Sequence, residues 1–141
     1  MDEQIHKVAK LFLSSLPHSQ ALGMEMVSVA PGMAEMRMPY RPEIVGDPET
    51  GVIHGGAVSA LMDTCGGLAA STHSGSFTGT ATLDLRIDYM RAATPGQAIT
   101  ARAECYHATR SVAFVRATAV DEDTDHPVAT ATGAFTVEAK K

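Results

Sequence analysis

The sequence predicts an α+β protein in which an antiparallel β-sheet wraps around one long central helix. The helix is indicated by residues 54–72, a run of mostly small and apolar side chains that contains a single acid, Asp63. The sheet is indicated by two short strand-like runs before this helix and four after it. In the run after the helix, apolar residues alternate with polar ones, as in a strand with one apolar face: Leu83, Leu85, Ile87 and Tyr89. A helix that covers such a face completes the architecture.

The composition is that of one globular domain over residues 1–141. Hydrophobic residues make up 45% of the chain and charged residues 19%, which is enough for a single core. The net charge of −5 argues against nucleic acid, whose protein partners usually carry a basic face. No apolar stretch reaches the ~18 residues of a membrane span, and the N-terminus lacks the basic start of a signal peptide. We therefore expect a cytoplasmic protein that binds neither nucleic acid nor a membrane.

Before the central helix, three segments are expected. Apolar residues at helical spacing predict an N-terminal helix over residues 1–16, which Pro17 ends: Ile5, Val8, Leu11, Phe12 and Leu16. Two strands are expected within residues 21–40, with a turn at Pro31-Gly32 between them, followed by an irregular loop up to residue 53.

Four further strands are expected after the central helix, at 80–90, 97–107, 111–120 and 127–137. Turn signals lie at Pro95-Gly96 and within 121–126. These turns separate three of the runs, which favours an antiparallel meander.

The central helix has two unlike faces. At 3.6 residues per turn, its larger apolar side chains form one stripe that should press on the sheet: Val58, Leu61, Met62, Cys65, Leu68 and Ala69. The opposite stripe holds small residues and the acid: Gly56, Ser59, Ala60, Asp63, Gly67 and Ala70. A glycine inside a helix costs about 1 kcal/mol relative to alanine, so Gly66 and Gly67 indicate close approach of another surface. We expect the small-residue face to pack on a second helix or to border a ligand.

The start of this helix offers hydrogen-bond donors. Near Gly55 and Gly56, N–H groups of the first turn point outward, and glycines let a ligand oxygen come close to the backbone. Such donors can stabilise the oxyanion that forms when a carbonyl group is attacked. A glycine-capped helix start without a further role accounts for the same residues equally well.

The spacing of Gly56 and Asp63 predicts a dimer. Asp63 lies seven residues further on, on nearly the same face but about 10 Å along the helix axis. One carbonyl carbon cannot lie within ~3 Å of both groups in a single chain. Two antiparallel copies of the helix would bring Asp63 of one chain toward Gly56 of the other. A catalytic interpretation therefore requires a homodimer with two sites at its interface.

The motifs together resemble a known family. His54-Gly55-Gly56 is followed by Leu61-Met62-Asp63-Thr64 and then by the run from Asp84 to Met90. This pattern resembles the hotdog-fold acyl-CoA thioesterases of the PaaI (phenylacetate-degradation) type, from about residue 22 to residue 137. The resemblance implies a hotdog fold, dimers paired into tetramers, and hydrolysis of acyl- or aryl-acyl-coenzyme A. Coenzyme A is then part of the substrate, and no separate cofactor is expected.

The resemblance also implies roles for four residues. The N–H of Gly55 would polarise the thioester carbonyl, with His54 beside it. Asp63 of the partner chain would act as a general base on water or as the nucleophile. Thr82 falls where relatives often have a serine or threonine that assists the acid or the water. Many relatives carry an asparagine about six residues before the histidine, where this chain has Pro48 between two acids.

Binding residues are expected beside this machinery. Gly56 would lie against the substrate, and Arg91 and Arg110 are candidate cations for the phosphates of coenzyme A. The histidines show no metal-ligand spacing, so no metal site is expected.

Two other functions remain open from the sequence. A hotdog acyl-CoA hydratase or dehydratase would use a histidine with an acid, for which His54 and Asp63 are available. A non-catalytic acyl-CoA-binding module would use the same fold without hydrolysis.

Overall fold

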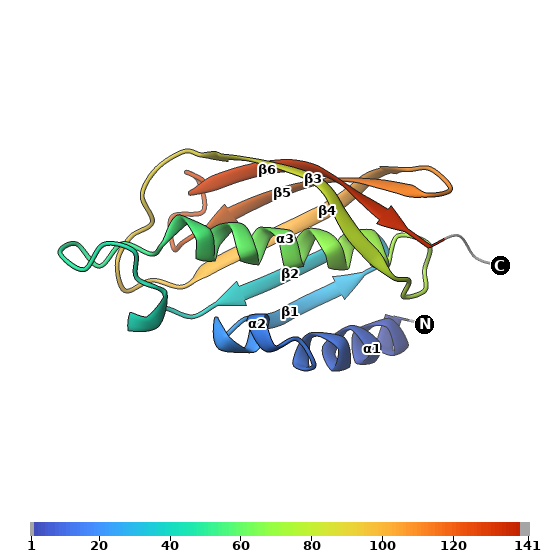
Figure 1. The fold of residues 1–141 in the computed structure, drawn as a ribbon, viewed down its shortest axis with the longest axis horizontal. Helices are drawn as coiled ribbons and strands as arrows, with labels where there is room; N and C mark the ends of the chain where they lie inside the picture. The colour runs from blue at the N-terminus through green and yellow to red at the C-terminus, as the bar shows by residue number, and fades with distance from the viewer. Residues whose placement is uncertain (1, 139–141) are drawn as a thin grey trace.

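A curved antiparallel sheet holds one long helix against its concave face in the computed structural model, which describes residues 2–138 (Figure 1). The sheet has six strands in the order β1-β2-β4-β5-β6-β3. The strands are β1 (Glu25–Ala30), β2 (Met33–Met38), β3 (Thr80–Tyr89), β4 (Ile99–Ala108), β5 (Val112–Val120) and β6 (Ala129–Val137). The helices are α1 (Asp2–Ser14), α2 (Pro17–Ala21) and α3 (Gly55–Ser71), with a 3₁₀ turn η1 (Pro42–Ile44). The predicted α+β hotdog architecture is confirmed.

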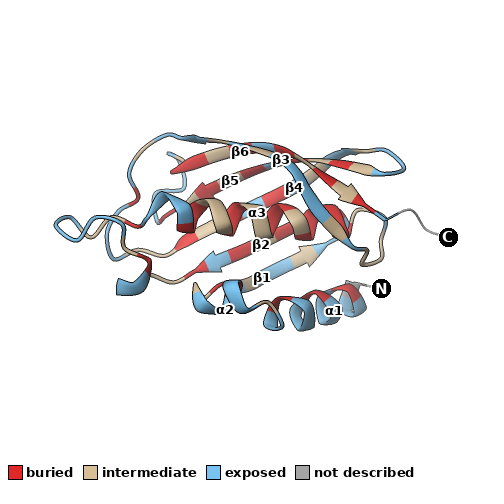
Figure 2. Cartoon of the chain, viewed as in Figure 1, coloured by how far each residue is buried: buried red, intermediate tan, exposed pale blue. Residues whose placement is uncertain are grey.

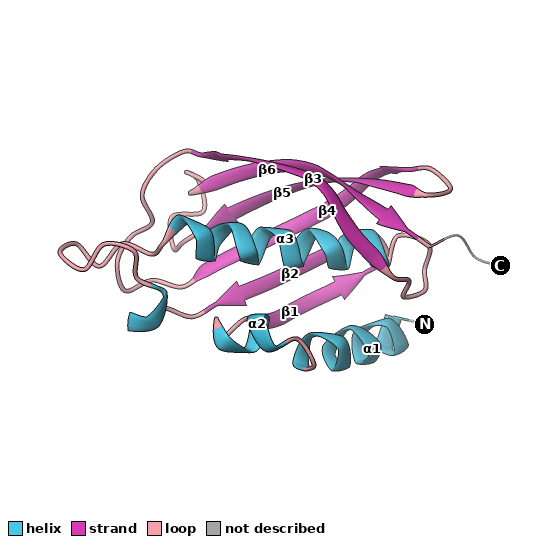
Figure 3. Cartoon of the chain, in the orientation of Figure 1, coloured by secondary structure: helices cyan, strands magenta, loops and turns pink. Residues whose placement is uncertain are grey.

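The order of the strands corrects the predicted meander. Strands β4, β5 and β6 do follow one another as neighbours, but β3 pairs with β6 and not with β4. Thr80 lies opposite Val137 and Tyr89 opposite Ala129, so β3 forms one edge of the sheet. The Pro95-Gly96 turn therefore belongs to a crossover that carries the chain from this edge to the middle of the sheet (Figure 3). A Pro-Gly pair marks a change of direction and does not specify which strand comes next to which.

Helix α3 buries the predicted stripe against the sheet (Figure 2). The helix begins after His54 and ends before Thr72, within one residue of the expected bounds. An added Cβ at Gly66 would lie 2.9 Å from Cζ of Phe135, so close approach of this ring accounts for that glycine. An added Cβ at Gly67 would lie 3.8 Å from Cγ2 of Thr80, an ordinary van der Waals distance. Close approach therefore does not account for Gly67. Ala70, expected on the outward face, is buried, as are Ala69 and Ser71 on either side of it.

The buried thiol of Cys65 lies in the stripe as expected. Desolvation raises the pKa of this thiol to about 12, so it stays protonated at neutral pH. It contacts the carbonyl oxygens of Ala34 and Ala101 on the neighbouring strands. Cys65 is therefore a core residue with no nucleophilic character.

The N-terminal segment differs from the expected single helix in two ways. Pro17 takes the first position of a second short helix, α2, where its missing N–H costs nothing. The buried face of α1 consists of Ile5, Ala9 and Leu13. The predicted apolar stripe is only partly correct, because three of its members are exposed at 38–62%: Val8, Leu11 and Phe12. None of the helices within residues 2–138 is long and apolar enough to cross a membrane.

The edge strand β3 is irregular at the position that matters for the site. Its register against β6 shifts between Thr82 and Asp84, so Leu83 sits in a β-bulge and is 58% exposed. Leu85 and Ile87 face inward and are half-buried, whereas Tyr89 at the strand end is 51% exposed. The expected alternation thus holds in the middle of the strand and fails at both ends.

Candidate active site

The acid of the central helix is held by a single hydroxyl group. Thr82 Oγ1, on β3, donates a hydrogen bond of 2.7 Å to Oδ1 of Asp63, on α3. Within residues 2–138, no donor reaches Oδ2 of this carboxylate. The structure therefore brings together two of the residues predicted from the sequence, and leaves one carboxylate oxygen available.

A small and largely apolar pocket surrounds this pair. Its volume is about 170 Å³, and Asp63, Thr64 and Thr82 are among its polar residues. The apolar lining comes from α1, from the segment after it, from α3 and from β6: Phe12, Leu16, Leu68 and Phe135. Asp63 is thus half-buried at the border of an apolar space, which is an arrangement suited to an acid that acts on a bound apolar molecule.

The backbone N–H groups of Gly55 and Gly56, at the start of α3, differ in their hydrogen bonding. Nδ1 of His54 accepts a hydrogen bond of 2.8 Å from the N–H of Gly56, so this histidine is the N-cap of the helix. The N–H of Gly55 has no acceptor among the residues that the structure describes. The capped-helix interpretation therefore holds for Gly56, and Gly55 carries the donor that is left for a ligand.

Tyr89 is a neighbour of this helix start to which the sequence pattern assigned no role in the site. Its hydroxyl group donates a hydrogen bond of 2.8 Å to the carbonyl oxygen of Gly55. An added Cβ at Gly55 would lie 3.5 Å from Cε1 of the same ring. The alternating pattern assigned Tyr89 to the apolar face of its strand, and only the placement of the strand end beside the helix start shows its contact.

A second pocket, of about 390 Å³, lies at the helix start. Gly55, Val58 and Tyr89 form one side of it, and Arg91 and Val128 contribute to the rest. Asp63 lies eight residues beyond Gly55, or about 12 Å along the axis of a helix. The donor and the acid therefore belong to two separate pockets within one chain.

Arg91 is occupied by the protein itself. Its guanidinium donates to both carboxylate oxygens of Asp121, over 2.8 and 2.6 Å, and also to the carbonyl oxygens of Ala92 and His126. The Asp121 side chain is fully buried, and the guanidinium holds the pKa of this carboxyl group well below its usual range. The pair ties the segment after β3 to the loop between β5 and β6. Phosphate binding by Arg91 would require this pair to open.

The remaining predicted residues lie elsewhere. Arg110 is exposed in the turn between β4 and β5, at the end of the sheet away from the start of α3 (Figure 1). Beside Pro48, both carboxylate oxygens of Asp47 accept hydrogen bonds within their own turn, from the N–H of Glu49 and the hydroxyl of Thr50. These bonds lower the pKa of Asp47, with the Thr50 hydroxyl as the main cause. No group of three His, Cys, Asp or Glu side chains suited to a metal ion is present in residues 2–138.

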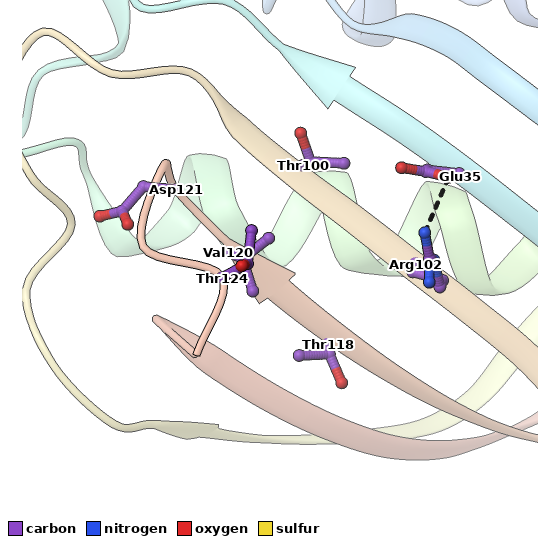
Figure 4. A pocket seen from close by; sticks show the side chains of 7 residues that line it. All are labelled: Glu35, Thr100, Arg102, Thr118, Val120, Asp121 and Thr124. Atoms are coloured by element: carbon purple, nitrogen blue, oxygen red, sulfur yellow. Dashed lines mark hydrogen bonds and ion pairs between the residues drawn. The ribbon is translucent and has the colours of Figure 1, made fainter. Parts of the chain in front are cut away.

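A further pocket, of about 440 Å³, lies on the convex face of the sheet, away from α3 (Figure 4). Its two acids are already paired, because Glu35 contacts Arg102 at 3.3 Å and Asp121 contacts Arg91. The other side chains that line it carry no charge: Thr100, Thr118, Val120 and Thr124. This pocket offers no unpaired acid or base, so the candidate active site is the one around Asp63 and Gly55.

One helix inside a curved antiparallel sheet, with an acid on the helix and one free amide donor at its start, is a hotdog fold that carries a candidate hydrolase site. The chain belongs to the thioesterase superfamily, whose model matches residues 50–128 and so includes every residue described in the two pockets on α3 except Phe12, Leu16 and Phe135. It is a thioester hydrolase of this family.

Individual relatives agree with this assignment. The medium/long-chain acyl-CoA thioesterase YigI of Salmonella typhimurium is 27% identical, with 96% of this chain and 95% of the relative covered. A crystal structure from Pseudomonas aeruginosa is 41% identical, with a TM-score of 0.83 and coverage of 94% of this chain and 98% of that one. A mutant of the phenylacetic acid degradation protein PaaI from Thermus thermophilus is 31% identical, with a TM-score of 0.75 and coverage of 86% and 98%. The resemblance to the PaaI type is confirmed.

Proposed function

We propose that this protein hydrolyses acyl-CoA thioesters at two sites, each shared between two protomers. The observation that carries the proposal is the hydrogen bond between Thr82 and Asp63 beside an apolar pocket. The hydroxyl fixes Oδ1, and Oδ2 is left to take a proton from water as the water attacks the thioester carbonyl carbon. Direct attack by this carboxylate on the same carbon is the second route that the geometry supports.

The helix start supplies the hydrogen-bond donor that polarises the thioester carbonyl. The N–H of Gly55 from the partner chain donates to the carbonyl oxygen, which becomes an oxyanion as the tetrahedral intermediate forms. When the carbon–sulfur bond breaks, the thiolate of coenzyme A leaves and is protonated, and the acid is released. His54 serves by capping the helix and keeping the first turn in place, because its Nδ1 is committed to Gly56. The N–H of Gly56 is committed to His54, so contact of Gly56 with the substrate remains a prediction.

The substrate class follows from the apolar pocket. Phe12, Leu16, Leu68 and Phe135 offer no hydrogen bonds and no charge to an acyl group, so they suit a hydrocarbon chain. The relative from Salmonella typhimurium is named as a medium/long-chain acyl-CoA thioesterase, which is the same chemistry. Arg110 remains a proposed contact for the phosphates of coenzyme A, and a cytoplasmic location remains a prediction.

Release of free thiol from a panel of acyl-CoAs tests this function. Hydrolysis gives one thiol for each acid formed. A hydratase or dehydratase would change the acyl chain without releasing thiol, and a binding module would bind acyl-CoA and leave it intact.

The proposal requires an oligomer, and β3 is the surface that would form it. Among the residues that the structure describes, one edge of β3 has no neighbouring strand, and Leu83 is 58% exposed beside Thr82. Pairing of two such edges would satisfy their backbone groups and cover this side chain. We expect sedimentation to show a dimer. Leu83→Lys should weaken the association of the two protomers and lower the activity. Leu11→Lys, on the exposed face of α1, should have little effect on either. A folded monomer with full activity would overturn the shared site. Pairing of dimers into a tetramer remains a prediction.

Tyr89→Phe should lower kcat with little change in KM. The hydroxyl holds the carbonyl of Gly55, whose own N–H is the proposed oxyanion donor, and a hydrogen bond of this kind is worth about 0.5–1.5 kcal/mol. We expect a loss of roughly threefold to tenfold in kcat. Tyr106→Phe, on another exposed strand position, is the control. An unchanged kcat in Tyr89→Phe would mean that this contact only supports the fold.

A further inference from the structure

The N-terminal helix contributes directly to the pocket around Asp63. Phe12, on α1, and Leu16, just after it, line this pocket together with the acid and Thr82. Neither residue is close to Asp63 in the sequence, and both lie outside the segment that matches the family model. The space next to the reacting group is therefore shaped by a part of the chain that does not carry the chemistry.

A second, larger pocket lies beyond Phe12. Its volume is about 460 Å³, compared with about 170 Å³ for the pocket around Asp63. Val8, one helical turn before Phe12, lines this second pocket with Ile5 and Phe77. None of the side chains that line it carries a charge.

The two pockets meet at a pair of aromatic rings. The ring centroids of Phe12 and Phe77 lie 5.1 Å apart, with the ring planes tilted by 54°. Phe12 lines the pocket that contains Asp63, and Phe77, from the loop between α3 and β3, lines the second pocket. Phe12 is 41% exposed, whereas Phe77 is half-buried and packs against the core.

We propose that the Phe12–Phe77 pair sets the length of acyl chain that the site accepts, and that the second pocket is the space a longer chain would enter. The inference rests on the proposed hydrolysis of acyl-CoA. An acyl chain with its carbonyl carbon near Asp63 extends into the apolar pocket and meets Phe12. Removal of either ring would connect the pocket around Asp63 with the second pocket.

Chain-length profiles test this role. We expect Phe77→Ala and Phe12→Ala to move the optimum of kcat/KM toward longer saturated acyl-CoAs by two to four carbons. Each additional buried methylene should raise kcat/KM roughly fourfold, the equivalent of about 0.8 kcal/mol. Substrates with two to four carbons do not reach Phe77, so their kcat/KM in Phe77→Ala should stay within twofold of the native value. If the two rings only supported the fold, their removal would change kcat/KM by the same factor for every chain length.

Leu11→Ala is the matched control, because Leu11 is an exposed apolar residue of the same helix that lines neither pocket. If either alanine variant fails to fold by circular dichroism, Phe77→Leu and Phe12→Leu shorten the ring with less loss of contact and should give a smaller shift in the same direction. An active native enzyme whose profile is the same in all Phe12 and Phe77 variants would overturn the inference and leave the proposed function standing. A native enzyme that releases thiol from no acyl-CoA would overturn both.

Discussion

Asp63→Asn should lower kcat for acyl-CoA hydrolysis by about 10²–10⁴-fold, the usual contribution of a general base. The asparagine side chain keeps an oxygen that can accept the hydrogen bond from Thr82, so the contact between α3 and β3 survives. What is lost is the ability to take a proton or to attack carbon. Because a carboxylate bordering an apolar pocket is also removed, the thermal midpoint should hold or rise.

Activity and thermal unfolding should be measured on the same preparation of Asp63→Asn. Glu122→Gln, which neutralises an exposed acid in the loop between β5 and β6, is the matched control and should be native in both measurements. Thr82→Val provides a second check, because it removes the only hydroxyl that reaches Asp63 within the described residues. A variant that melts early yet hydrolyses acyl-CoA at the native rate would show that Asp63 is structural.

Arg91→Ala should destabilise the protein, because it removes the only cation paired with the buried carboxylate of Asp121 within the described residues and leaves it the N–H groups of Thr94 and Asp123. Arg91→Lys should recover only part of this loss, since an ammonium group cannot donate to both carboxylate oxygens in the same planar geometry. Urea unfolding at neutral pH measures both effects. Native stability with a raised KM for CoA substrates, but not for short thioesters without the nucleotide, would instead make Arg91 a phosphate ligand.

The same pair predicts how stability depends on pH. The pKa of Asp121 is lower in the folded protein than the ordinary value of 3.8, so the folded state favours the ionised carboxylate. The stabilisation is therefore complete above the unfolded pKa, near pH 4 and higher, and is lost as the pH falls toward the folded pKa. We expect the difference in unfolding free energy between the native protein and Arg91→Ala to shrink between pH 5 and pH 2.

The central helix and its acid could be predicted from the sequence because their signals are local. A run of small and apolar residues begins at His54, a side chain able to cap the helix, and the helical period alone separates the buried stripe from Asp63. The motifs around these residues also sufficed to suggest the family. The rise of a helix also led to the prediction of a site shared by two chains, which stays a prediction.

The features that could not be predicted from the sequence depend on which elements become neighbours in the fold. Turn residues near Pro95 do not specify that β3 pairs with β6, and without this pairing Tyr89 cannot be placed beside Gly55. From the sequence, Arg91 is expected to be an exposed and unpaired cation on a loop. Only the fold shows that Asp121, thirty residues later, pairs with it. For α1, the amphipathic pattern could not tell which apolar residues would be buried, since Phe12 faces the site pocket and not the core.

The position of β3 also determines when the site can be completed during synthesis. Thr80 at the start of β3 pairs with Val137 near the end of the described chain, and the whole strand depends on β6 for its hydrogen bonds. Such distant pairings form slowly, because the ends of a long segment must first meet. A ribosome-bound chain that lacks β6 thus holds the central helix with Asp63 but has no place for the strand that carries Thr82. Until β6 emerges, β3 is an unpaired strand whose apolar side chains Leu85 and Ile87 are uncovered, and unpaired strand edges of this kind favour aggregation of a nascent protein.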